Sequence, residues 1–114
     1  MRFFLGFVYA FRGMWEVIKS EQSFRLHLLA FVLVVVAGFH FRIQPMEWIS
    51  ILMISSVVLG LEAINTSLER LCDELTEERR ESIRIIKDIA AGAVLISAIG
   101  ALVIAVIIFR KYLI

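Results

Sequence analysis

Three acidic side chains and one amide recur at helical spacing near the middle of the chain. Glu62, Asn65, Glu69 and Asp73 lie at offsets of 0, 3, 7 and 11 from the first of them. At about 100° per residue, these positions fall within roughly 80° of one another around a helix. Oxygen ligands on one stripe suit a divalent cation and a phosphate better than they suit an apolar core.

Glu62 follows directly on the uncharged stretch 48–61, so it would lie at the edge of the hydrocarbon if that stretch crosses a membrane. An ionisable group there is costly unless it is paired, hydrated or bound to an ion. This position suits a general base that takes a proton from a lipid hydroxyl. Asn65, one turn further on, could orient that base or the hydroxyl.

The sequence contains no Gly-rich phosphate loop, no dinucleotide fingerprint and no G-x-S-x-G nucleophile motif. Phosphate would therefore be held by side chains and a bound cation. Glu69 is a candidate Mg²⁺ ligand, and Glu21, just before the first apolar stretch, could be its partner. Lys87 is a candidate point charge for the phosphates of ATP, and Asp88 follows it at the same membrane level.

These polar residues also have simpler interpretations. Glu69 and Asp73 could form ordinary interfacial ion pairs with Arg70. Lys87 could extend along apolar surface to reach water, and Asp88 could cap the N-terminus of the third long helix.

Residues next to the first apolar stretch have simple interpretations too. Glu21 could complement the dipole of the helix that it precedes. His27 and His40 lie near opposite ends of one predicted span, so they cannot share a metal ion. We interpret His27 as a hydrogen-bonded packing residue.

The composition is that of a membrane protein. The 114 residues are 61% hydrophobic with a mean hydropathy of +0.89, and the formal net charge of +1 disfavours nucleic-acid binding. Cys72 is the single cysteine, so an intrachain disulfide is impossible. We expect no signal peptide, because Arg12 interrupts the first apolar run and no small-residue cleavage site follows.

Three stretches without charge, 26–41, 48–61 and 89–109, predict transmembrane helices over 24–43, 46–72 and 86–110. Pro45 marks the turn between the first two. The fold class is therefore all-α, with one integral membrane domain over residues 1–114.

Residues 2–20 predict a separate amphipathic helix that lies in the membrane surface. The residues that share its apolar face are Phe3, Phe4, Phe7, Val8, Phe11, Met14, Trp15 and Ile18. Its polar face carries Arg2, Tyr9, Arg12, Glu16 and Lys19. The polar face could cover a site below it.

The basic residues predict the orientation. Nine Lys or Arg residues lie before the first span or between the second and third spans. Three lie between the first and second spans or after the third. The positive-inside rule then puts the N-terminus and the acidic stripe in the cytoplasm and the C-terminus outside. The charged linker 74–84 has no Gly or Pro, so we predict a helical extension of the second span followed by a turn.

Two sequence blocks resemble the prokaryotic diacylglycerol kinase family, which includes the undecaprenol kinases. They are Glu62-Ala-Ile-Asn-Thr-Ser-Leu-Glu-Arg-Leu-Cys-Asp73 and Lys87-Asp-Ile-Ala-Ala-Gly-Ala-Val94. The N-terminal stretches Phe11-Arg-Gly-Met-Trp-Glu16 and Glu21-Gln-Ser-Phe-Arg-Leu-His27 resemble the undecaprenol kinase branch. The resemblance covers nearly the whole chain.

The resemblance implies a homotrimer in the bacterial inner membrane, with active sites shared between neighbouring subunits at the cytoplasmic surface. It implies that Glu62 is the catalytic base with Asn65 beside it, and that Glu21 and Glu69 hold Mg²⁺. The residues implied to bind the nucleotide are Arg2, Tyr9, Glu21, Glu69, Asp73, Lys87 and Asp88.

The expected function is an ATP- and Mg²⁺-dependent lipid kinase that prefers undecaprenol to diacylglycerol. One alternative is a kinase that acts mainly on diacylglycerol. Another is a non-enzymatic oligomer such as a small ion conductor, although a pore would need polar positions throughout the span. A phosphatase that uses the same metal site is a third.

Overall fold

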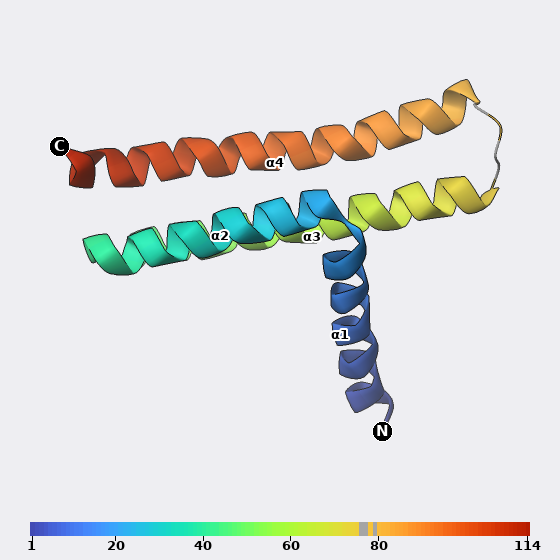
Figure 1. The fold of residues 1–114 in the computed structure, drawn as a ribbon, viewed down its shortest axis with the longest axis horizontal. Helices are drawn as coiled ribbons and strands as arrows, with labels where there is room; N and C mark the ends of the chain where they lie inside the picture. The colour runs from blue at the N-terminus through green and yellow to red at the C-terminus, as the bar shows by residue number, and fades with distance from the viewer. Residues whose placement is uncertain (76–77, 79) are drawn as a thin grey trace.

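The structure is a computed structural model that describes residues 1–75, 78 and 80–114. This part of the chain forms four helices: α1 (Arg2–Ser20), α2 (Gln22–Phe41), α3 (Pro45–Leu75) and α4 (Glu81–Leu113), shown in Figure 1. The last three are long and apolar enough to cross a membrane. The predictions of an all-α fold and of three membrane-spanning helices are confirmed.

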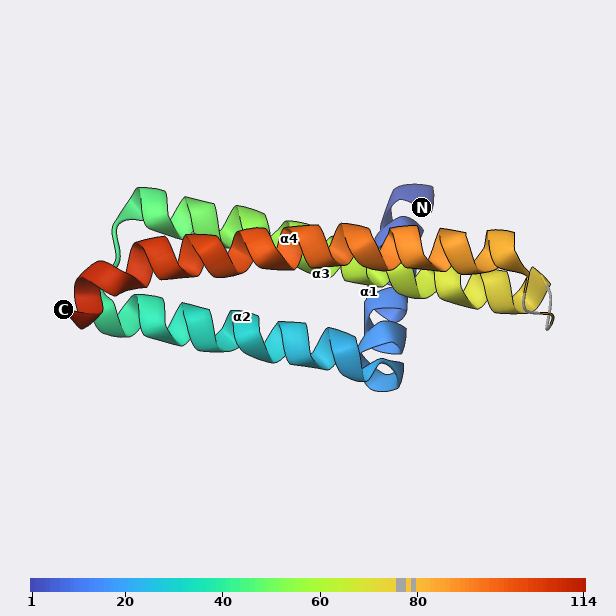
Figure 2. The same cartoon turned by 90° about the horizontal axis from the view of Figure 1, so that it is seen from above.

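Helices α2, α3 and α4 run side by side, and α1 leaves the bundle steeply (Figures 1 and 2). α3 packs mainly against α4 and less closely against α2. α2 begins partway along α3, so α3 and α4 continue together beyond it toward the linker. Glu62 lies where α2 begins, and the rest of the acidic stripe (Asn65, Glu69 and Asp73) lies on this part of α3.

The helix ends have local causes. α2 ends at Phe41 because Arg42 adopts a left-handed conformation with φ 54°. α3 begins at Pro45, a residue that fits the first turn of a helix. The backbone N–H of Gln44 donates a hydrogen bond of 2.9 Å to the Glu47 carboxylate.

The charged linker is partly helical. α3 continues to Leu75, and α4 begins at Glu81 rather than at residue 86. Arg84 pairs with Glu81 and with Asp88 along one face of α4, which supports this early turn. The rest of the predicted extension falls partly on 76, 77 and 79, outside the described residues.

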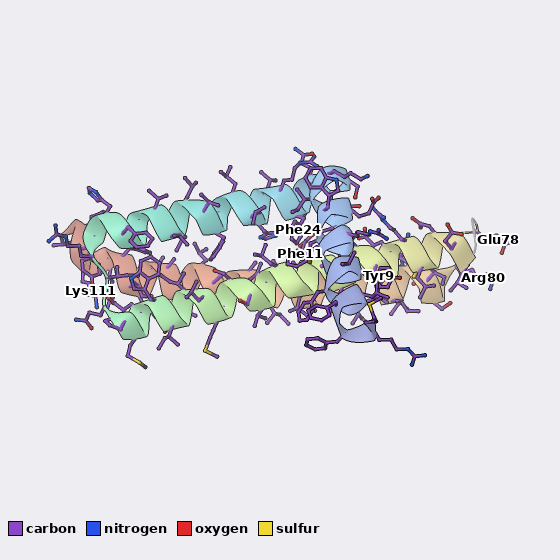
Figure 3. All side chains as sticks on the ribbon, turned by 90° about the horizontal axis from the view of Figure 1, so that it is seen from below. Tyr9, Phe11, Phe24, Glu78, Arg80 and Lys111 are labelled. Carbon is purple, nitrogen blue, oxygen red and sulfur yellow. The ribbon has the colours of Figure 1, made fainter. Side chains whose placement is uncertain are left out.

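Polar contacts among Glu47, Lys111 and Tyr112, here called the clamp, join α3 and α4 at the end of the bundle far from the linker. The Glu47 carboxylate accepts a hydrogen bond from the Tyr112 hydroxyl at 2.6 Å, and the Lys111 ammonium lies 2.5 Å from its other oxygen. Figure 3 shows Lys111 at the end of the bundle far from Glu78 and Arg80. The clamp ties the end of α4 to the start of α3, beside an apolar cluster centred on Ile43, Ile51 and Ile108.

The bundle exposes large apolar side chains along most of its length. Phe39 is 72% exposed, Ile96 is 74% exposed and Leu102 is 66% exposed. In water such a surface would be unstable, whereas lipid tails or another protein surface can cover it. The chain is therefore a membrane protein.

Candidate active site

Glu62 is buried at the point where α2 begins alongside α3, with its side chain 6% exposed. The Ser23 hydroxyl donates a hydrogen bond of 2.8 Å to one carboxylate oxygen. The other oxygen lies 3.5 Å from Nε2 of His27. Each oxygen of this carboxylate thus has a partner on α2.

Ser23 was missing from the residues that we singled out, and His27 was interpreted only as a packing residue. They lie four residues apart on α2, so they share one helix face. The spacing of four residues was visible in the sequence and indicates a shared helix face. Which residue that face contacts depends on how α2 is rotated about its axis relative to α3. The structure supplies this rotation.

Asn65 and Glu69 lie next to each other on α3, one turn apart. The Asn65 amide group donates a hydrogen bond of 3.4 Å to a Glu69 carboxylate oxygen. The amide oxygen of Asn65 is buried and has no hydrogen-bond partner within the described part of the chain. Leaving such an oxygen unsatisfied costs about 1–3 kcal/mol, so it is suited to a cation or to a substrate donor.

Asp73 and Lys87 bring the linker ends of α3 and α4 together. The Lys87 ammonium lies 2.8 Å from a carboxylate oxygen of Asp73. Asp88 accepts a hydrogen bond of 2.7 Å from Arg84. The interpretation of Asp88 as a helix cap is wrong, because Arg80 occupies the cap position of α4.

Three other predicted site residues lie on or beside α1. Glu21 stands at the junction of α1 and α2, where it occupies the N-cap position of α2 without a side-chain cap bond. Arg2 and Tyr9 are exposed on α1, which points away from the bundle in Figure 1, and Figure 3 marks Tyr9 on this helix. A single chain thus leaves Arg2 and Tyr9 away from the linker end, where Asp73 and Lys87 meet.

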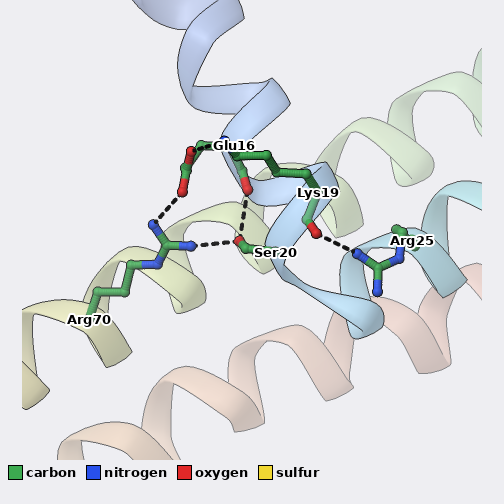
Figure 4. Close-up of polar contacts among 5 residues, drawn as sticks. All are labelled: Glu16, Lys19, Ser20, Arg25 and Arg70. Atoms are coloured by element: carbon green, nitrogen blue, oxygen red, sulfur yellow. Dashed lines mark hydrogen bonds and ion pairs between the residues drawn. The ribbon is translucent and has the colours of Figure 1, made fainter.

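Side chains anchor α1 across α3 (Figure 4). The Arg70 guanidinium of α3 lies 3.4 Å from the Glu16 carboxylate and donates a hydrogen bond of 2.5 Å to the Ser20 hydroxyl. A hydrogen bond from Lys19, and then Arg70, hold the pKa of the Glu16 carboxyl below its ordinary value. Arg25 of α2 donates to the backbone carbonyls of Ile18 and Lys19 at 2.8 and 3.0 Å.

An apolar cavity of about 290 Å³ lies between α2, α3 and α4. His27 is one of its lining residues, so the cavity reaches the side chain that contacts Glu62. Its other lining residues are Ala30, Phe31, Val34, Ser55, Val58, Leu59, Ala98, Ala101, Leu102 and Ala105. Such a lining accepts hydrocarbon but offers little to a charged ligand.

The donors on the acidic stripe fit a magnesium ion by chemistry. Glu69 is half-buried and the Asn65 amide oxygen is unsatisfied, and both are hard oxygen donors. The described residues contain no group of three His, Cys, Asp or Glu side chains placed to hold a metal ion together. Mg²⁺ often takes only one or two carboxylates together with substrate phosphates and water, so such a group is not required.

The sequence is similar to those of known kinases. The profile of the family "Prokaryotic diacylglycerol kinase" matches residues 8–109. The chain is 35% identical to the undecaprenol kinase of Bacillus subtilis over 95% of its own length and 88% of that protein. It is 32% identical to a diacylglycerol kinase of Synechocystis over 88% of its own length, and it spans 58% of that longer protein.

The relatives are kinases, which confirms the prediction of a lipid kinase over the ion-conductor and phosphatase alternatives. Membership of a kinase family also implies ATP as the co-substrate and a lipid as the acceptor. The chain therefore belongs to the prokaryotic diacylglycerol kinase family and is a membrane-embedded lipid kinase.

Proposed function

We propose that this kinase transfers the γ-phosphate of ATP to the hydroxyl of undecaprenol, with diacylglycerol as a poorer acceptor. The observation that carries the proposal is the buried Glu62 carboxylate beside His27, a lining residue of the apolar cavity. A lipid chain in this cavity would bring its hydroxyl toward Glu62. The greater similarity to the Bacillus undecaprenol kinase, over more of both chains, favours undecaprenol.

In the proposed reaction, Glu62 is the general base. The lipid hydroxyl oxygen forms a bond to the γ-phosphorus, and the bond between this phosphorus and the β–γ bridging oxygen breaks. ADP leaves with that electron pair, and the hydroxyl proton passes to the Glu62 carboxylate. Asn65 orients the base or the hydroxyl, and the reaction otherwise depends on positioning and charge neutralisation.

Glu69 and Glu21 are proposed to hold Mg²⁺, which would neutralise charge on the ATP phosphates. Lys87, Asp73 and Asp88 are proposed to contact ATP at the linker end of α3 and α4. The contact between Lys87 and Asp73 supports this, because it keeps an ammonium close to the acidic stripe.

Arg2 and Tyr9 are proposed to complete the nucleotide site of a neighbouring subunit in a homotrimer. Their position on α1, away from the bundle of their own chain, supports this assignment. α1 is proposed to lie in the membrane surface, and its steep angle to the bundle supports that placement.

The distribution of basic residues supports the bacterial inner membrane orientation proposed here, with the N-terminus and the active site in the cytoplasm and the C-terminus outside. The linker end of the bundle would then face ATP. The clamp of Glu47, Lys111 and Tyr112 would face the outside.

The test is phosphate transfer from labelled ATP in mixed micelles, with undecaprenol and a short-chain diacylglycerol in separate reactions, each with and without Mg²⁺. We expect Mg²⁺-dependent label in both lipids and a higher kcat/KM for undecaprenol. A higher kcat/KM for diacylglycerol would assign the chain to the other branch. Equal transfer after removal of Mg²⁺ by a chelator would contradict the metal assignment.

Two variants separate the proposed roles. Glu62→Gln removes the base, so transfer to either lipid should be lost while ATP binding and the oligomer remain. Glu69→Gln should weaken the Mg²⁺-dependent part of nucleotide binding. A Glu62→Gln enzyme with most of its activity would show that another group takes the proton.

A further inference from the structure

Two side chains of α2 hold the two oxygens of Glu62 separately. Ser23 Oγ donates to Oε1 at 2.8 Å, and His27 Nε2 lies 3.5 Å from Oε2. A carboxylate held at one oxygen can still turn about its terminal torsion, which has a broad energy profile. Contacts at both oxygens restrict this rotation.

The segment of α2 that carries these residues is itself fixed by packing. Phe24, next to Ser23, is 3% exposed and lies near the junction with α1 (Figure 3). Arg25 donates hydrogen bonds to two backbone carbonyls at the end of α1, which joins the two helices at this point. Ser23 and His27 therefore belong to a segment that burial and hydrogen bonds attach to the end of α1.

We infer that Ser23 and His27 are positioning residues for phosphoryl transfer, which orient the Glu62 carboxylate toward the hydroxyl of the bound lipid. This inference rests on the proposed role of Glu62 as the base. Neither residue takes the proton; each fixes one oxygen of the group that does. Since a base must lie within hydrogen-bond reach of the proton it takes, a rotated carboxylate is a poorer base.

His27 also lines the cavity in which we propose that the lipid chain binds. It is half-buried, its imidazole meets Glu62 on one side, and it lines the apolar cavity between α2, α3 and α4. If the lipid chain occupied this cavity and its hydroxyl lay at Glu62, the part of the chain next to the hydroxyl would lie beside His27. His27 thus orients the base where the acceptor hydroxyl would arrive.

The proposal is tested with paired substitutions that keep or remove the donor. Ser23→Ala and His27→Leu remove it; Ser23→Thr keeps the hydroxyl, and His27→Gln keeps an N–H at similar reach. We expect kcat for undecaprenol to fall roughly 10- to 100-fold in the first pair, because small misplacements of a reacting group have effects of this size. The second pair should recover most of kcat, and KM for ATP should stay unchanged in all four.

Matched controls come from the same helices. His40→Leu changes the other histidine of α2, which meets the Phe41 ring edge-on with ring centroids 4.8 Å apart. Ser56→Ala removes a hydroxyl of α3 that donates a hydrogen bond of 2.7 Å to the Leu52 carbonyl in its own helix. Both controls should retain wild-type kcat.

A second measurement separates positioning from folding. In a Glu62→Gln background, Ser23→Ala and His27→Leu should cause no further loss of the residual rate, because there is no carboxylate left to orient. Equal kcat for His27→Leu and His27→Gln, or a further loss in the Glu62→Gln background, would overturn the inference.

The outcomes also distinguish this inference from the proposed function. If Glu62→Gln is inactive while Ser23→Ala and His27→Leu are fully active, the base assignment stands and the positioning role is wrong. If Glu62→Gln is active, the assignment of the base itself fails. Size-exclusion chromatography identifies variants that do not assemble. In that case kcat of Ser23→Thr and of His27→Gln is compared with the wild-type value instead.

Discussion

Lys87 of α4 lies 2.8 Å from a carboxylate oxygen of Asp73 on α3, and this ion pair joins the two helices near the linker. The Asp73 side chain is 69% exposed, and ion pairs as exposed as this contribute little to stability. The ammonium can therefore exchange Asp73 for a phosphate oxygen at small cost. The pair holds Lys87 at the position where we propose that it contacts the nucleotide.

Replacing Lys87 by Met should raise KM for ATP by about tenfold or more, because a charge-assisted hydrogen bond to phosphate is lost. KM for the lipid should stay near its wild-type value. Initial rates at saturating lipid measure this. Lys19→Met, which removes an ammonium from α1, is the matched control, and an equal rise in KM for this control would indicate a general charge effect.

Replacing Arg70 by Leu should loosen α1, since Arg70 supplies the side-chain contacts from α3 to Glu16 and Ser20. Exposed pairs of this kind contribute little to stability, so amide exchange in α1 should accelerate only a few-fold. Hydrogen-exchange mass spectrometry of the α1 peptides measures this.

The matched control for Arg70 is Arg12→Leu, which removes a guanidinium from α1 itself. Arg12 lies 5.8 Å from the centre of the Tyr9 ring, so its loss leaves the contacts between Arg70 and α1 intact. Exchange in α1 that is faster in Arg12→Leu than in Arg70→Leu would contradict the anchoring role.

The attachment of α1 should also weaken in acid. The pKa of Glu16 is held below its ordinary value of 4.5, first by Lys19 on α1 itself and then by Arg70 of α3, and the pairing with Arg70 stabilises the docked helix above that pH. This stabilisation is lost as the pH falls through the lowered value. In a Trp48→Phe background, acrylamide quenching of Trp15 should rise below about pH 4.5. Arg70→Leu should reduce this pH dependence, and an unchanged transition would assign it to another group.

The helices were predictable from the sequence because the uncharged runs are long and the breaks between them are sharp. The stretch 89–109 is long enough to span a membrane alone, and Pro45 ends the preceding turn. The helical spacing of Asn65 and Glu69 likewise predicted that they are neighbours, and they share a hydrogen bond of 3.4 Å.

Contacts between helices were less predictable. Whether Ser23 and His27 face Glu62 or lipid depends on the rotation of α2, and a helix that is apolar all round gives no periodic signal for it. The same is true of Glu47, whose partners Lys111 and Tyr112 come from the far end of the chain. The stripe of α3 was visible in the sequence, whereas its partners on other helices were not.

Replacing Gly38 by Ala should destabilise the bundle by about 1–3 kcal/mol. A Cβ atom there would lie 2.7 Å from the Trp48 ring and 3.1 Å from Ile43 Cδ1, so the packing at the α2–α3 turn must shift. Thermal unfolding in detergent micelles measures the change. Gly60→Ala is the matched control, because a Cβ there meets nothing within 4 Å in its own chain. Equal loss in both variants would point to a general effect of added methyl groups.

Removing the Tyr112 hydroxyl should lower the thermal midpoint by several degrees without changing kcat for undecaprenol. The hydroxyl donates a 2.6 Å hydrogen bond to Glu47, at the end of the bundle far from the linker and the acidic stripe. Tyr112→Phe keeps the ring that packs on the apolar cluster, so the change isolates this bond. Because Glu47 is the acceptor, Tyr112→Phe should cost less in a Glu47→Gln background than in the wild type. Fully additive losses would show that the two side chains stabilise the bundle independently, and a fall in kcat would show that the clamp also shapes the active site.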